Sequence, residues 1–181
     1  AQLRAGERVL ISGIGGGVAL FALQYAVAAG AEVWVTSSSN EKIERGVSLG
    51  AKGGFNYREE GWGKAAHGSV DGFDVIVDSA GGDGFKGLID LCRPGARVVF
   101  FGATRGDPEV LPMRKVFWKQ ISLLGTTMGS PADWSAMIVF VEQYQIHPIV
   151  SDTFALTDAP AAFDLMEQGG QFGKIVVTMK T

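Results

Sequence analysis

The residues with the clearest chemical potential form a glycine-rich turn, Ser12 to Ala19 (SGIGGGVA). The turn follows the apolar run Val9 to Ile11 and opens the apolar stretch Leu20 to Ala29, which is typical of a buried helix. Glycines in such a turn let backbone N–H groups approach a phosphate, and the positive end of the helix dipole favours an anion. The turn therefore predicts a site for the pyrophosphate of a dinucleotide. The predicted amide donors are Gly16, Gly17 and Val18.

The sequence of the turn is also compatible with a turn that binds no ligand. It fails the pattern G-x-G-x-x-G because Val18 occupies the last place, but it fits G-x-x-G-x-x-A with Gly13, Gly16 and Ala19. A short motif of this kind also occurs as a tight turn that binds nothing. The segments further along the chain must decide between the two interpretations.

The residues that follow the second predicted strand bear on the choice of cofactor. An NAD site usually has Asp or Glu about 20 residues after the glycine turn, where it binds the ribose 2′-hydroxyl. Here the segment 35–39 reads VTSSS and holds no acid. Ser37 and Ser38 could donate to a 2′-phosphate, and Lys42 could supply the charge. This pattern favours NADP over NAD.

Each of these residues also has a structural interpretation. Ser38 to Glu41 (SSNE) reads as a capping box, so that Ser38 would be only a helix N-cap. Lys42 would then be a solvated lysine. A cation in the first turn of a helix opposes the helix dipole, however, which favours a functional reason for it.

Strand and helix patterns alternate through most of the chain and predict βαβ units with a parallel sheet. The strands are near-continuous apolar runs, as in a sheet that is covered on both faces. We therefore predict an α/β fold: a Rossmann-type, doubly wound, six-stranded parallel sheet with helices on both faces, plus a C-terminal return segment. The strands are expected at 8–11, 32–36, 54–57, 73–77, 97–101 and 121–126, and residues 58–68 read only as a polar stretch.

The composition of the chain argues against several classes of partner and site. The chain has 181 residues, 46% of them apolar, and a net charge of −3, which argues against nucleic acid or an anionic membrane as partner. No apolar run is long enough to span a membrane. His67, His147 and the single Cys92 show no metal-ligand spacing. One cysteine cannot form an internal disulfide, so we expect a cytoplasmic location.

At this point the chain resembles the cofactor-binding part of the medium-chain dehydrogenase/reductase superfamily, within its quinone-oxidoreductase-like and zinc-type alcohol dehydrogenase branch. The segments that carry the resemblance cover nearly the whole chain in order: GERVLISGIGGGVALFALQYA, EVWVTSSSNEKIERGVSLGA, FNYREE, FDVIVDSAGG, RPGARVVFFGATRG and QFGKIVVT.

The resemblance implies a division of the chain and a missing partner. Residues 1–147 would be the NAD(P)-binding Rossmann domain, and residues 148–181 would pack on a catalytic domain that precedes this segment in such enzymes. We therefore expect a piece of a larger enzyme, whose substrate pocket lies on that other domain. The substrate and any zinc depend on that domain too, so this sequence indicates neither.

Further cofactor contacts come from the ends of the other strands. The resemblance places Tyr57 near the adenosine phosphate, although a half-buried aromatic residue would look the same. Small residues at strand ends let a dinucleotide lie against the backbone. We expect such contacts at Ser79, Ala80, Phe101 and Gly102. Met128 would touch the nicotinamide side, or simply fill a gap in the core.

The sequence thus predicts an NADP(H)-binding domain of an oxidoreductase that transfers hydride between the nicotinamide and a quinone, enone, aldehyde or alcohol. No catalytic or metal-binding constellation is expected in this chain. The alternative is a stand-alone nucleotide-binding module without catalysis. The resemblance also implies a homodimer through the strand at 121–126, which is apolar and has no charge to protect an edge.

Overall fold

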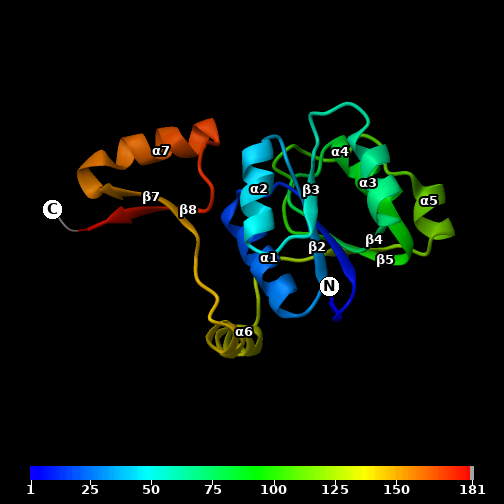
Figure 1. The fold of residues 1–181 in the computed structure, drawn as a ribbon, viewed down its shortest axis with the longest axis horizontal. Helices are drawn as coiled ribbons and strands as arrows, with labels where there is room; N and C mark the ends of the chain where they lie inside the picture. Colours follow the sequence, from blue (N-terminus) through cyan, green and yellow to red (C-terminus); the bar gives the residue numbers. More distant parts are fainter. Residues whose placement is uncertain (180–181) are drawn as a thin grey trace.

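The computed structural model describes residues 1–179 and contains a six-stranded parallel sheet in the order β3-β2-β1-β4-β5-β6 (Figure 1). This order reverses between β1 and β4, as in a doubly wound nucleotide-binding fold. The predicted fold class is confirmed. The strands are β1 (Arg8–Ile11), β2 (Glu32–Ser37), β3 (Gly53–Asn56), β4 (Phe73–Asp78), β5 (Cys92–Phe100) and β6 (Ser122–Gly125).

Helices cover both faces of this sheet, and they divide the core into two clusters. Leu10 of β1 faces a cluster with Ile76 and Leu88, whereas its neighbours Val9 and Ile11 face the opposite cluster. Because both faces are buried, successive residues of a strand are apolar, and the strands show no alternation. The helices are α1 (Gly17–Ala28), α2 (Asn40–Ser48), α3 (Trp62–Val70), α4 (Gly84–Leu91), α5 (Met113–Trp118) and α6 (Pro131–Tyr144).

Figure 1 shows α1 and α2 on one side of the sheet and α3, α4 and α5 on the other. Helix α6 lies beside α1, where the Phe140 ring meets the Tyr25 ring edge-on at 5.7 Å. No helix within residues 1–179 is long and apolar enough to cross a bilayer.

A small second sheet stands apart from the first, as Figure 1 shows. It consists of β7 (Val150–Ala155) and β8 (Lys174–Thr178), which pair in parallel. The connection between them contains a 3-10 turn (Leu156–Asp158) and α7 (Ala159–Gln168). This unit returns the chain to the carboxyl end of β1, since Gly173 N donates to Gly15 O at 2.8 Å.

The sequence pattern does not predict two of the helices, α3 and α5. The polar stretch 58–68 contains most of α3, whose glycines and charges hide the helix, while its Ala66 and Val70 are buried. Helix α5 is six residues long and has no buried residue, so its sequence shows no apolar stripe.

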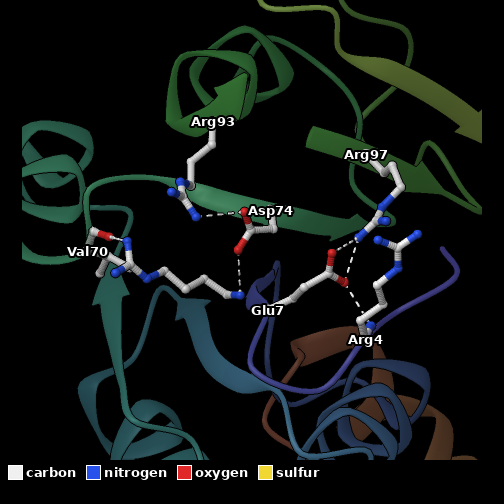
Figure 2. A network of polar contacts seen from close by, with 7 residues as sticks. Arg4, Glu7, Val70, Asp74, Arg93 and Arg97 are labelled. Atoms are coloured by element: carbon white, nitrogen blue, oxygen red, sulfur yellow. Dashed lines mark hydrogen bonds and ion pairs between the residues drawn. The ribbon is translucent and has the colours of Figure 1, made fainter. Parts of the chain in front are cut away.

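A polar network joins the amino ends of the strands, at the far end of the sheet from the glycine turn (Figure 2). Arg97 Nη2 donates to both carboxylate oxygens of Glu7, at 2.6 and 2.7 Å. Asp74 accepts from Arg93 Nη1 and from the Arg8 backbone N–H, both at 2.9 Å. These contacts tie the segment before β1 to β4 and β5.

Candidate functional site

The glycine turn joins β1 to α1 and is held by the end of β2. Gly13 and Gly15 have φ angles of +67° and +124°, which favour glycine. Ile14 N donates to Thr36 O at 2.7 Å, and Gly13 N donates to Thr36 Oγ1 at 3.2 Å. The turn is therefore fixed in a shape that brings its backbone to the carboxyl edge of the sheet.

Helix α1 begins at this turn with free backbone donors. Its N-cap is Gly16, which offers no side-chain acceptor, and its first turn contains no acid. The amides of Gly17 and Val18 therefore have no capping group, and the Val18 side chain is 53% exposed. Such a helix end attracts an anion through both its N–H groups and its dipole.

A lysine that the sequence analysis missed lies at the same helix end. A Cβ built on Gly17 would lie 2.6 Å from Lys174 Cε and 2.8 Å from Lys174 Nζ. Glycine at position 17 leaves room for this side chain, and the ammonium adds a full positive charge to the helix dipole. In the sequence, Lys174 appears only as the first residue of an apolar strand, and nothing there links it to α1.

Lys42 lies close by. The sequence predicts a 2′-phosphate as the partner of its ammonium, but in the structure the ammonium binds backbone carbonyls. Its Nζ donates to the carbonyls of Gly169 and Gln171, at 2.7 and 2.8 Å, and its side chain passes over Gly15. The guanidinium of Arg45, one turn further along α2, lies 4.0 Å from the centre of the Phe172 ring. Helix α2 is thus fastened to the turn before β8, the strand that begins at Lys174.

The serines after β2 have distinct surroundings. Ser39 is the N-cap of α2, since its Oγ accepts from Lys42 N at 3.3 Å; Ser38 does not have this role. Ser37 is buried, and its Oγ accepts from Ser39 N at 3.2 Å. Ser38 is half-buried. Ser37 and Ser38 thus lie at the end of β2, where a ribose would be bound.

A cavity of about 200 Å³ opens between the carboxyl ends of β2 and β4. Asp78 lines this cavity and is 2% exposed. The Asp78 carboxylate accepts from Ser12 Oγ and, at 2.8 Å, from Gly81 N, so it joins the loops after β1 and β4. Residues from both sides line the cavity: Ser12, Gly13, Thr36, Tyr57, Trp62, Asp78, Ala80, Gly81, Gly84, Leu88 and Arg105.

Of the other predicted contacts, Tyr57 and Ala80 line this cavity. Ser79 and Gly102 face each other across the ends of β4 and β5, where a Cβ on Gly102 would lie 3.1 Å from Ser79 O. Phe101 follows β5 directly and is half-buried. Met128 lies past β6, is 94% exposed and has a φ of +55°, so it fills no gap in the core of this chain.

The groups with shifted pKa values lie outside the crevice. Burial raises the pKa of the Cys92 thiol to about 12, and burial also raises the pKa of Tyr25. Hydrogen bonds from the Ser130 backbone and side chain lower the pKa of Asp133. In the described part of the chain, no group of three or more His, Cys, Asp and Glu side chains could hold a metal ion.

Comparison with known proteins agrees with this architecture. The family model described as zinc-binding dehydrogenase matches residues 17–143. The zinc-type alcohol dehydrogenase-like protein YogA of Leptosphaeria maculans is 35% identical, over 96% of this chain and 51% of that protein. The quinone oxidoreductase of Mus musculus is 30% identical, over 99% of this chain and 57% of that protein.

Solved structures are similar over nearly the whole chain. A crystal structure of an NAD-dependent alcohol dehydrogenase has a TM-score of 0.90 and 34% identity, and the match covers 98% of this chain and 52% of that one. The quinone oxidoreductase of Thermus thermophilus, solved also with NADPH, has a TM-score of 0.84 and 26% identity, over 99% of this chain and 60% of that one. The chain thus spans about half the length of the curated relatives it matches. It belongs to the zinc-binding dehydrogenase family and forms the cofactor-binding domain of a medium-chain dehydrogenase/reductase.

Proposed function

We propose that this chain is the NADP(H)-binding domain of an oxidoreductase that transfers hydride between the nicotinamide and a quinone, enone, aldehyde or alcohol. The observation that carries the proposal is the uncapped start of α1 beneath the Lys174 ammonium, at the point where the strand order of the sheet reverses. The bound nicotinamide would supply the hydride chemistry, and this chain would supply binding and orientation.

The pyrophosphate fits the start of α1. The amides of Gly16, Gly17 and Val18 would donate to its oxygens, and Lys174 would neutralise part of its charge. Ser79, Ala80, Phe101 and Gly102 would line the course of the cofactor along the strand ends. Met128, exposed past β6, would contact the nicotinamide half.

The end of β2 supports NADP over NAD. An acid at the position of Ser37 would bind the ribose 2′-hydroxyl and repel a 2′-phosphate, and this chain has none. Ser37 and Ser38 would donate to the phosphate, with Tyr57 nearby, since Tyr57 N donates to Ser37 O at 3.0 Å. Lys42 makes its two hydrogen bonds to neutral carbonyls, so its charge is not neutralised there, and an ammonium has a third donor for the phosphate.

Two further properties belong to this proposal. The edge strand β6 carries no charge and Leu124 is 38% exposed, which supports a homodimer formed through this strand. The buried Cys92 thiol supports a reducing, cytoplasmic location. A small-molecule substrate would bind between this chain and the catalytic domain that such enzymes carry.

Calorimetric titration of the chain with NADPH and with NADH tests the proposal. We expect binding of both, tighter for NADPH, and no steady turnover with a quinone or enal by this chain alone. Equal affinities for the two cofactors would contradict the choice of NADP. Oxidation of NADPH by the isolated chain at about 1 per second or faster, an ordinary enzyme rate, would contradict the proposal that the substrate pocket requires a second domain.

A further inference from the structure

The loops that follow β4 and β5 are joined by backbone hydrogen bonds. Thr104 N donates to Ser79 O at 3.2 Å, Arg105 N donates to Ala80 O at 2.8 Å, and Gly82 N donates to Gly106 O at 2.7 Å. This close approach requires glycine: Gly82 has a φ of +58°, and a Cβ on it would lie 2.9 Å from Arg105 O. The backbone that carries Arg105 is therefore held firmly at the carboxyl edge of the sheet.

The Arg105 side chain crosses the crevice from this loop toward β3. Its Cζ lies 5.3 Å from the centre of the Tyr57 ring. Tyr57 is itself fixed beside β2 by its hydrogen bond to Ser37 O. Both side chains line the cavity of about 200 Å³ that Thr36 and Asp78 also border. Two planar groups, one from the loop after β3 and one from the loop after β5, thus meet over one cavity.

Arg105 differs from the arginines of the polar network in Figure 2. Arg93 and Arg97 are paired with Asp74 and Glu7, whereas no carboxylate within residues 1–179 forms an ion pair with Arg105. Its contact with Tyr57 is therefore not held by an opposite charge and can be exchanged. A guanidinium is planar and stacks on aromatic faces, which a lysine ammonium cannot do.

We propose that Arg105 and Tyr57 hold the adenine ring of the cofactor by stacking. This inference rests on the proposed cofactor function and adds a contact that is independent of the 2′-phosphate. In a doubly wound fold the ribose binds at the end of β2, and the cavity opens there, beside Thr36. Adenine is the flat, apolar part of the cofactor next to that ribose, and it presents the face that both side chains bind.

Affinities of the chain for NADPH, NADH and AMP test the proposal, measured by calorimetry on the wild type, Arg105→Ala and Arg105→Lys. Stacking on adenine predicts that all three ligands lose about five- to tenfold in affinity, which corresponds to a cation–π contact. Arg105→Lys keeps the charge but loses the plane, so it should lose nearly as much. Tyr57→Phe keeps the ring and should bind as the wild type does, whereas Tyr57→Leu should not.

Arg58→Ala is the matched control, because Arg58 is exposed and neighbours Tyr57 but does not line the cavity. It should leave all three affinities unchanged. A loss confined to NADPH and restored in Arg105→Lys would assign Arg105 to the phosphate and overturn the proposal. Unchanged affinities in Arg105→Ala would overturn it too, while leaving the cofactor function intact. A wild-type chain that binds none of the three ligands would overturn both.

Discussion

The ammonium of Lys174 lies against Gly17, the first residue of α1, so closely that a Cβ on Gly17 would stand 2.8 Å from Nζ. Strand β8 thus places a cation at the start of α1. Lys174→Met should weaken NADPH and NADH alike by about ten- to hundredfold, the value of a hydrogen bond between charged groups. Calorimetry gives both affinities.

Gly17→Ala provides a second test of the same relationship. The added methyl group meets the flexible end of Lys174, so the side chain moves away and the fold is retained. We expect a loss of cofactor affinity similar to that of Lys174→Met, with a thermal unfolding midpoint close to that of the wild type. Gly63→Ala, in open space on α3, is the matched control: it makes the same glycine-to-alanine change in a helix and should leave the cofactor affinity unchanged. Normal affinity in Gly17→Ala would argue against a role for Lys174.

Lys42→Ala distinguishes two roles of this lysine: binding the 2′-phosphate, and anchoring the turn before β8. Loss of a charged hydrogen bond to the phosphate predicts an NADPH affinity about ten- to hundredfold lower, with NADH nearly unchanged. If Lys42 only holds the carbonyls of Gly169 and Gln171, the affinities for both cofactors should fall together, because the turn that positions Lys174 would be less firmly held.

Ser37→Asp adds the missing ribose-binding acid and should reverse the cofactor preference toward NADH, as measured by the same titrations.

The edge strand β6 predicts the assembly state. Leu124→Lys places a charge on the exposed edge and should convert a dimer to a monomer, as measured by sedimentation at micromolar concentration. Met166→Lys, on the exposed face of α7, is the control and should leave the dimer intact. A wild-type monomer at that concentration would contradict the proposed dimer.

We expect the ion pair between Arg97 and Glu7 to contribute to the stability of the fold and not to cofactor binding. Both side chains are less than one-fifth exposed, so Arg97→Met leaves a carboxylate without its partner and should lower the free energy of unfolding by about 3 kcal/mol. Lys115→Met breaks a pair whose two side chains are nearly half exposed, and it should cost less than about 1 kcal/mol. Urea unfolding measures both, and neither variant should change cofactor affinity, since both pairs lie away from the crevice.

The pKa of Cys92, raised by burial to about 12, predicts a loss of stability at alkaline pH. An unfolded thiol releases its proton near pH 8.5, while the folded chain keeps it. The contribution to stability is therefore complete below about pH 8.5 and falls as the pH rises toward 12. Cys92→Ala should flatten this part of the curve of unfolding free energy against pH. Fast alkylation of the native thiol at pH 8 would contradict the shifted pKa.

The central strands were predictable because both faces of the sheet are covered there, so that Val9, Leu10 and Ile11 are all buried and form one apolar run. The glycine turn was predictable because its φ angles exclude most other residues. Helix α3 was not, since only a minority of its residues are buried. Lys174 and Arg105 could not be found from the sequence, because their neighbours Gly17 and Tyr57 are distant along the chain and only the fold brings them together.

The hydrogen bond from Gly173 to Gly15 joins the turn before β8 to the cofactor turn after β1. During synthesis on the ribosome, the six-stranded sheet can therefore form before the site is complete, because β8 emerges after all six of its strands. We expect a product truncated after α6 to fold its sheet and yet gain little protection from NADPH against proteolysis. The cofactor would then stabilise only chains whose translation has passed β8.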